Sequence, residues 1–352
     1  MRWIAAALAL LAAFPAAAQD RPPCREVGDA PHIVIDPAAA AQLAHIGLDR
    51  AAIFARMRET SIPETMGCWA MPVGNFDSQL VSVGMAQRNY GTGSLQPQLI
   101  AWRDGFRSRS RFRRALKAIA PTYGKLFFSR DCLKIPVGDK CRTGILAAHQ
   151  PDGKLNPVAL AELTRLFEND AMLQVQTNTY IDLLLEVRAE LFRLWPAGPI
   201  TPRKVKWAID TRVQQKTLPG DEDVARLRRK LGNVPSSERA AKLKAILVWY
   251  QGLSEAVDQD GVGRDYAWNI RQWTCLIDAG QIDDEQFELL HLSYLRSRTA
   301  TGNSGRWQAL TFSRRAKIIL GTGSVSGVRD GGCPTMQSSP GGGGGPPKAV
   351  EG

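Results

Sequence analysis

The stretch Arg58–Pro97 reads RETSIPETMGCWAMPVGNFDSQLVSVGMAQRNYGTGSLQP, and its character differs from that of the chain on either side. Proline and glycine recur in it, and both residues interrupt helices. The short apolar runs between them predict small strands around a turn. The flanking sequence has the periodicity of amphipathic helices. We therefore expect a mainly α fold of α+β character, with a small β hairpin inserted beside one helix.

The helical pattern begins before this stretch and resumes after it. Apolar spacing predicts a helix over residues 38–58, so that Glu59 would lie at its C-terminal end. Further helices are predicted downstream, over Pro97–Phe106, Leu155–Asp170, Met172–Trp195, Lys204–Lys216, Asp221–Leu231, Glu238–Val257, Tyr266–Ala279, Asp283–Arg298 and Trp307–Leu320. Polar starts such as Asp283-Asp284-Glu285 suit helix caps. The glycines of Gly321-Thr322-Gly323, after the last predicted helix, are interpreted as a turn.

Residues 1–18 have the pattern of a signal peptide. Arg2 is followed by the apolar run Trp3–Phe14 and by small residues up to Ala18. We expect cleavage after Ala18, export to the periplasm or the medium, and no stable membrane insertion afterwards. An extended segment over 19–36, one domain over 37–336 and a flexible Gly/Pro-rich tail over 337–352 would complete the chain.

The six cysteines are an even number, which suits an oxidising compartment. Cys132 and Cys141 flank a short loop and predict a local disulfide, whereas the other pairings stay open. No Cys-x-x-Cys pair occurs, and the four histidines are scattered along the chain. Phosphate-binding and zinc-protease motifs are also absent from the sequence. We expect no metal and no other cofactor.

Basic residues exceed acidic ones, 45 to 34, and give a formal net charge of +11. The densest basic run lies between Arg103 and Lys117. Such a run is typical of a solvated helix face, and a site for an anionic polymer is the alternative. Because no recognition motif accompanies the run and the chain is expected to be exported, we expect no nucleic-acid partner. The alternative function, an exported nucleic-acid-binding protein, rests only on the net positive charge.

Two carboxyl groups in contrasting surroundings are the candidate chemistry of the first stretch. Glu59 is expected at a helix C-terminus, where the helix dipole disfavours a carboxylate. Asp77 is expected on a polar turn, where it would stay ionised. Two carboxyl groups in such different surroundings can take different roles, one as a general acid and the other as a base. Glycoside hydrolysis needs an acid and a base that face each other across one cleft. Glu64 is a rival for the acid, but we expect it in a loop after Pro63.

The stretch resembles the catalytic region of the lysozyme-like superfamily, specifically the chitosanases of glycoside hydrolase family 46 and related exported, peptidoglycan-directed proteins. The eighteen-residue separation of Glu59 and Asp77 agrees with that family, as do the three short segments GNFD (74–77), SVGMAQ (82–87) and GTGSLQP (91–97). Less specific similarity extends over roughly residues 45–330, through WAIDTRVQQ (207–215), RRAKII (314–319) and GTGSV (321–325).

The resemblance implies a two-lobed lysozyme-like fold and hydrolysis with inversion. Glu59 would protonate the glycosidic oxygen, and Asp77 with Ser82 would activate water, with the carboxyl groups about 6.5–9.5 Å apart. Ser82 could instead serve only as a strand residue. Substrate contacts are expected from five further side chains: Gln87, Asn89, Tyr90, Asp210 and Gln214. The alternative for Tyr90 is a place in the core, and the alternative for Asp210 and Gln214 is buried hydrogen bonding.

Three positions depart from the family pattern. Arg88 stands where relatives commonly have Trp, Gln79 replaces a basic residue, and Ser326 stands where His is frequent. The alternative function is therefore a catalytically inactive peptidoglycan-binding or envelope-assembly protein. Charge bears on the substrate, because the mature chain, near +10, gains no long-range attraction from polycationic chitosan. We expect a monomer that acts on a β-1,4-linked amino-sugar polymer, with peptidoglycan favoured over chitosan.

Overall fold

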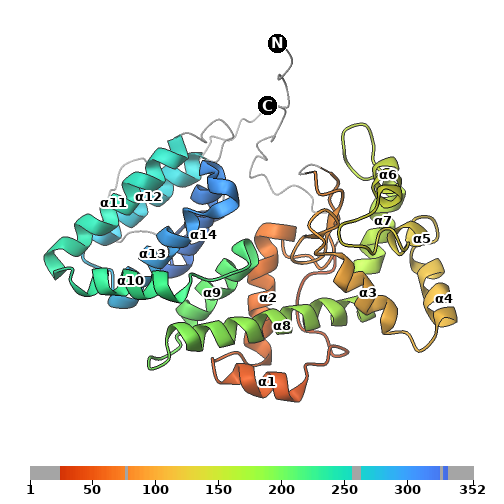
Figure 1. The fold of residues 1–352 in the computed structure, drawn as a ribbon, viewed down its shortest axis with the longest axis horizontal. Coiled ribbons are helices and arrows are strands. Elements are labelled where there is room, and N and C mark those ends of the chain that lie inside the picture. The colour runs from red at the N-terminus through yellow and green to blue at the C-terminus, as the bar shows by residue number, and fades with distance from the viewer. Residues whose placement is uncertain (1–23, 76–77, 256–262, 326–327, 332–352) are drawn as a thin grey trace, which may run out of the picture. The chain divides into compact units, whose positions relative to one another are not determined.

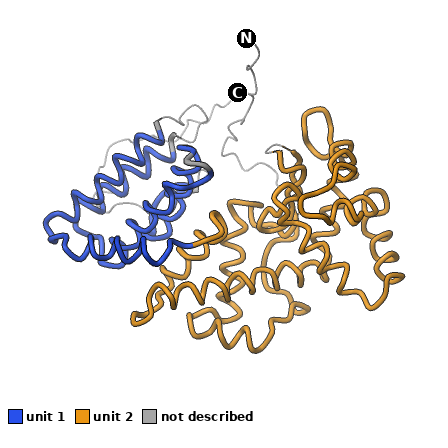
Figure 2. The backbone as a smooth tube through the Cα atoms, viewed as in Figure 1, with its two compact units in different colours: residues 1–16, 218–352 blue, residues 17–217 orange. Residues whose placement is uncertain are grey.

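The structure, a computed structural model, describes residues 24–75, 78–255, 263–325 and 328–331 of the 352-residue chain. Within these ranges the fold is mainly helical, with two small two-stranded sheets (Figure 1). The described residues form two compact units, divided between Thr217 and Leu218 (Figure 2). The segment 37–336, expected as one domain, therefore contains parts of both units. The predicted signal peptide and the predicted tail lie outside the described residues.

The N-terminal unit, up to Thr217, consists mostly of helices. Several of them begin at a polar residue whose side chain accepts a backbone N–H of the first turn, as at Asp36, Asn156 and Thr201. The helices are α1 (Pro37–Ala44), α2 (Arg50–Thr65), α3 (Gln96–Asp104), α4 (Arg109–Ile119), α5 (Gly124–Phe127), α6 (Asp139–Ala147), α7 (Pro157–Phe167), α8 (Asp170–Leu194) and α9 (Pro202–Gln215).

The single helix predicted over 38–58 is wrong, because the structure has two helices there. α1 ends at Ala44, Gly47 adopts a positive φ of 73°, and Asp49 caps the start of α2. α2 then continues to Thr65, beyond the predicted end. The left-handed glycine ends the first helix, and the aspartate cap begins the second. Because the apolar spacing continues across this boundary, periodicity alone does not reveal it.

The predicted β hairpin is confirmed as a small antiparallel sheet. β1 (Ser82–Val83) pairs with β2 (Arg88–Asn89), with Ser82 opposite Asn89 and Val83 opposite Arg88. Ser82 also pairs on its other side with Val73, through two backbone hydrogen bonds of 2.8 and 3.1 Å. The backbone around Ser82 is therefore held by two neighbouring segments.

A buried amide on α8 fixes the turn of this hairpin. Gln176 is 1% exposed, and its Oε1 accepts the Met85 N–H at 2.9 Å while its Nε2 donates to the Phe167 carbonyl at 3.0 Å. Gly84 adopts a φ of 86°, and a Cβ there would lie 2.9 Å from the Gln176 Oε1. Only glycine fits this turn without displacing the amide.

Aromatic rings fill the core between α3, α4 and the end of α5. Trp102 is 1% exposed, and its ring centroid lies 4.9 Å from that of Phe106, 5.8 Å from Phe112 and 5.3 Å from Phe128. Edge-to-face and tilted arrangements of this kind are favourable beyond the area that they bury. The cluster holds the apolar side of α4 against the rest of the unit.

Two disulfides join segments of the N-terminal unit. Cys132 and Cys141 are bonded, which confirms the predicted local bridge. Cys24 is bonded to Cys68, 44 residues away, and Glu26 forms a backbone bridge with the same Cys68. The start of the described chain is therefore fastened to the segment that follows α2.

The C-terminal unit, from Leu218 onwards, is a group of helices followed by a second hairpin. Asp283 and Gln286 form a reciprocal capping box at the start of α13, in agreement with the polar start predicted there. The elements are α10 (Asp221–Gly232), α11 (Ser236–Glu255), α12 (Gly263–Asp278), α13 (Asp284–Ser297), a 3₁₀ helix (Ala300–Asn303), α14 (Gly305–Leu320), β3 (Gly323–Val325) and β4 (Val328–Asp330).

A buried polar network attaches this hairpin to α11 and α12. Asn269 is fully buried, and its Nδ2 donates to the Tyr250 hydroxyl at 3.2 Å and to the Ser324 carbonyl at 2.9 Å. Its Oδ1 accepts the Ser324 N–H, and Asp265 accepts the Ser324 hydroxyl. The turn predicted at Gly321–Gly323 is more ordered than expected, because Gly321 ends α14 with a φ of 69° and Gly323 begins a strand.

The Asn269 side chain should contribute strongly to the stability of the C-terminal unit. Replacing it in Asn269→Ala would leave the backbone N–H and C=O of Ser324 buried and unsatisfied. We expect the free energy of unfolding to fall by about 2–4 kcal/mol in urea titrations followed by circular dichroism. Asn233→Ala, at an exposed position of the same unit, is the control, and equal losses in both variants would contradict this role.

Acid should destabilise the C-terminal unit through His291. This side chain is 8% exposed on α13, and its burial lowers the pKa of the imidazole. The unfolded chain takes up a proton near pH 6.5 while the folded chain does not, so the free energy of unfolding should fall as the pH drops below that value. Urea titrations at pH 7.5 and 5.5 should show a smaller fall in His291→Gln than in the native chain. The exposed His45→Gln should behave as the native chain does.

Candidate active site

The position of Glu59 in α2 differs from the prediction. The helix continues six residues past it to Thr65 and ends where Met66 adopts a left-handed φ of 53°. Pro63 lies inside the helix and did not end it. Its ring lacks the N–H that would bond the carbonyl of Glu59, so the helical ladder loses one hydrogen bond and still continues. The expectation that Glu59 ends a helix is wrong.

The Glu59 carboxylate lies between two cations. Its Oε2 is 2.5 Å from Nη1 of Arg56, one turn earlier, and its Oε1 is 3.3 Å from Nζ of Lys206 on α9. The side chain is 47% exposed. The carboxylate is thus about half exposed to solvent and forms an ion pair at each oxygen.

Glu64 occupies the position that we expected for Glu59. It lies in the last turn of α2, half-buried, rather than in a loop. Its Oε1 accepts a hydrogen bond from Nε2 of Gln214 at 3.1 Å. The negative end of the helix dipole and partial burial, the two effects assigned to Glu59, therefore act on Glu64.

One stripe of α9 faces both glutamates of α2. Lys206, Asp210 and Gln214 are spaced four residues apart, which places them on one side of the helix. Lys206 contacts Glu59, and Gln214 contacts Glu64. Asp210 lies between them in sequence and is buried, at 7% exposure. Of the two predicted α9 residues, Gln214 thus contacts α2 directly, and Asp210 shares its side of α9.

The partner carboxylate and its serine are only partly described. Asp77 lies outside the described residues. Ser82 is 3% exposed, and its backbone N–H and carbonyl both bond Val73. The serine is thus at least a structural member of the sheet, which was the alternative considered for it.

Gln87 and Asn89, two further residues predicted to contact the substrate, form hydrogen bonds within the protein. Gln87 donates from Nε2 to the Met71 carbonyl at 3.0 Å. Asn89 accepts the backbone N–H and the hydroxyl of Thr92 at its Oδ1, both at 2.8 Å. Both side chains are half-buried, so they hold the loops on either side of the sheet.

Tyr90 is a core residue, and the expected substrate contact from it is wrong. Its side chain is fully buried, and its hydroxyl donates to the Phe127 carbonyl at 3.0 Å. Burial raises the pKa of the hydroxyl well above its ordinary value. A ring without any exposed surface cannot stack on a sugar.

Two of the three positions that depart from the family pattern, Arg88 and Gln79, lie at the same sheet. Arg88 is half-buried on β2, and burial lowers the pKa of its guanidinium. Gln79 packs against Gly91, where a Cβ would lie 2.2 Å from the glutamine Oε1. Ser326 lies outside the described residues.

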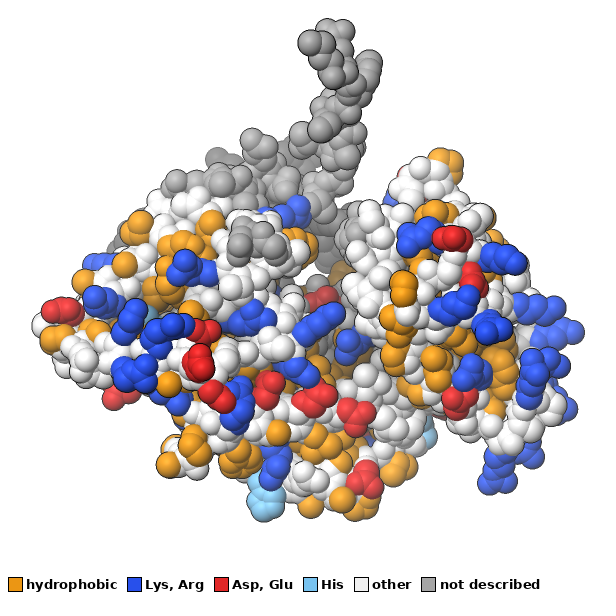
Figure 3. Space-filling model, viewed as in Figure 1, with side chains coloured by type: hydrophobic (Ala, Val, Ile, Leu, Met, Phe, Trp, Pro, Cys, Tyr) orange, Lys and Arg blue, Asp and Glu red, His pale blue; other side chains and the backbone are white. Residues whose placement is uncertain are grey.

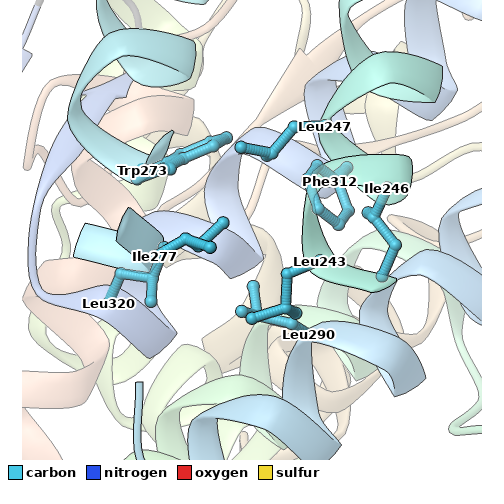
Figure 4. Close-up of a pocket in the computed structure, with 8 residues that line it drawn as sticks. All are labelled: Leu243, Ile246, Leu247, Trp273, Ile277, Leu290, Phe312 and Leu320. Atoms are coloured by element: carbon cyan, nitrogen blue, oxygen red, sulfur yellow. The ribbon is translucent and has the colours of Figure 1, made fainter. Parts of the chain in front are cut away.

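An apolar pocket in the C-terminal unit offers no polar chemistry. Its lining comes from α11, α12, α13 and α14, and the side chains around it in Figure 4 are aliphatic or aromatic: Leu243, Ile246, Leu247, Trp273, Ile277, Leu290, Phe312 and Leu320. In the described ranges, no group of three or more His, Cys, Asp or Glu side chains is placed to hold a metal ion. None of the described helices is both long and apolar enough to cross a membrane.

Comparison with known proteins assigns no family to this chain, so its class is described by its fold. No protein-family model, curated protein or solved structure matches the sequence or the structure. The observations define a mainly helical, disulfide-bonded protein with a small hairpin after α2.

Sequence reasoning missed the two cations that contact Glu59. Lys206 lies four residues before Asp210, which was already selected together with Gln214. Extending that stripe by one step would have found it. Arg56 lies three residues before Glu59, a spacing at which helix side chains meet.

The close approach of Gly91 and Gln79 should be essential for the sheet. In Gly91→Ala the new methyl group would meet the Gln79 backbone Cα at 2.9 Å as well as its side chain. We expect a loss of about 1–3 kcal/mol in the free energy of unfolding, measured by urea titration. Gly105→Ala is the matched control, because its Cβ would find only ordinary contacts at 3.5 Å. Unchanged stability in Gly91→Ala would contradict the described packing.

Proposed function

We propose that the chain is an exported glycoside hydrolase that cleaves a β-1,4-linked amino-sugar polymer, with peptidoglycan as the favoured substrate. The proposal places the reaction in the N-terminal unit and assigns it to the lysozyme-like group that the sequence resembles. The observation that carries it is a half-exposed carboxylate, Glu59, held between Arg56 and Lys206 on the helix that leads into the hairpin carrying Ser82.

The surroundings of Glu59 suit the anion that remains after proton donation rather than the protonated acid. A general acid becomes an anion as it gives up its proton to the leaving oxygen, and neighbouring cations stabilise that anion. Arg56 and Lys206 are in place for this role, one on each carboxylate oxygen. The exposure of the side chain also allows a polymer to approach it. In this mechanism Asp77, with Ser82, activates a water molecule on the opposite face of the sugar.

Export and substrate choice rest on separate observations. Two described disulfides and the lack of a membrane-spanning helix among the described residues are compatible with a secreted or periplasmic protein. The net charge of +11 favours a wall polymer that bears peptide carboxylates over polycationic chitosan.

Release of reducing ends from peptidoglycan and from chitosan tests the proposal. We expect Glu59→Gln to lower turnover at least about 100-fold, because the loss of a general acid typically costs that much or more. Asp77→Asn should have a similar effect. Circular dichroism should show that both variants fold as the native chain does.

Two further variants make the assignment specific. Asp104→Asn removes an exposed, ion-paired carboxylate of the same unit and should leave turnover unchanged. If Glu64→Gln lost activity while Glu59→Gln kept it, the donor would be Glu64, at the helix end.

A second function has support of its own. The buried Tyr90, the engaged Gln87 and Asn89, and the arginine at position 88 leave fewer side chains for a sugar than the family pattern implies. They favour an envelope protein that binds peptidoglycan without cleaving it. Sedimentation with purified walls, together with no more reducing ends than the walls release without protein, would support this function and contradict hydrolysis.

A further inference from the structure

Helix α4 carries a dense set of exposed cations. We define the α4 basic face as six side chains, all exposed, that lie on the helix or just before it: Arg107, Arg109, Arg111, Arg113, Arg114 and Lys117. In the described part of the chain, none of the six forms an ion pair or a side-chain hydrogen bond. Figure 3 shows Lys and Arg side chains gathered over α4, with few acidic ones beside them.

This arrangement costs the helix stability. Arg109, Arg113 and Lys117 follow one another at four-residue intervals, where like charges repel each other. The first turn contains no acidic residue and carries Arg109 and Arg111, although the helix dipole favours anions at that end. An ordinary solvated face mixes both signs of charge, and α4 contains no Asp or Glu at all.

The opposite side of α4 packs against the rest of the N-terminal unit. Leu116 is buried, and Phe112 packs against Trp102 and Phe128 in the aromatic cluster. Arg165 of α7 donates to the Ile119 carbonyl at the C-terminal end of α4, at 3.0 Å, and its side chain is exposed there as a further cation. The Cα atoms of Arg109, Arg113 and Lys117 thus follow one another along one side of the helix, with a rise of about 6 Å between neighbours.

The chemistry of the face selects among anionic partners. None of the large apolar side chains that are exposed elsewhere lies on α4, so the face has nothing to insert into a lipid bilayer. Its aromatic rings pack on one another and cannot stack on the bases of a single strand. A linear chain with regularly spaced anionic groups fits such a row of cations.

We propose that the α4 basic face is a docking site for a linear acidic polysaccharide, separate from the candidate active site. The choice of a polysaccharide rests on the proposed function, whereas the cationic row does not depend on it. Docking of this kind would keep the protein on an acidic envelope polymer through charge contacts that salt weakens.

Binding of the purified mature protein to immobilised polygalacturonate, measured by biolayer interferometry at several salt concentrations, tests the proposal. We expect the triple variant Arg109→Gln/Arg113→Gln/Lys117→Gln to bind about 100-fold more weakly at low salt, at roughly fivefold per charge. Its affinity should also depend less steeply on salt, because fewer counterions are released. Relief of repulsion should leave its melting temperature equal or higher.

A matched control separates the face from net charge. Arg229→Gln/Lys230→Gln/Lys242→Gln removes three exposed cations from the C-terminal unit and should bind as the native chain does. Equal weakening in both triple variants, or none in the α4 variant, would overturn the proposal. Tighter α4-dependent binding to a 20-base-pair DNA duplex or to phosphatidylglycerol vesicles would overturn the choice of partner. Glu59→Gln should bind polygalacturonate normally, so a failure of the hydrolase proposal is distinguishable.

Discussion

The buried amide of Gln176 is the contact on which the candidate site depends. This side chain joins the end of α7, the central helix α8 and the turn of the hairpin, through hydrogen bonds to Phe167 and Met85. Because an unsatisfied buried amide is costly, the turn has one stable position against α8. The sheet built on that turn, and Ser82 within it, take their places from this contact. Gly84 is the residue that makes room for it.

Much of the helical fold follows from periodicity in the sequence. Long elements with a polar start, such as α8 and α13, lie within a few residues of their predicted ends. Errors arise where one residue overrides the pattern. Gly47 divides a continuous apolar spacing into two helices, and Pro63, which was expected in a loop, lies inside α2. The strands β3 and β4, of three residues each, were not predicted, because such short strands depend on the partner segment and on Asn269.

The candidate site was predictable in its members but not in its geometry. The position of Glu59 in the chain and the family resemblance selected Glu59, Asp210 and Gln214; in the structure Lys206 contacts Glu59, Gln214 contacts Glu64, and Asp210 is buried on the same side of α9. Chain position and resemblance say nothing of burial, which removes Tyr90 from the set of possible ligand contacts. Glu64, and not Glu59, lies at the end of the helix because α2 is longer than predicted. The six residues of helix beyond Glu59 place Glu64, and not Glu59, near the negative end of the helix dipole.

The bond between Cys24 and Cys68 encloses both α1 and α2 in one covalent loop of 44 residues. In the chain-entropy view, closing a loop of this length removes unfolded conformations worth about 4 kcal/mol. That is a large share of the roughly 5–15 kcal/mol by which folded domains usually exceed their unfolded chains. The same sequence therefore has two different stabilities, one for the reduced thiols and one for the cystine. A chain made where thiols stay reduced would reach its full native strength only after crossing into an oxidising space.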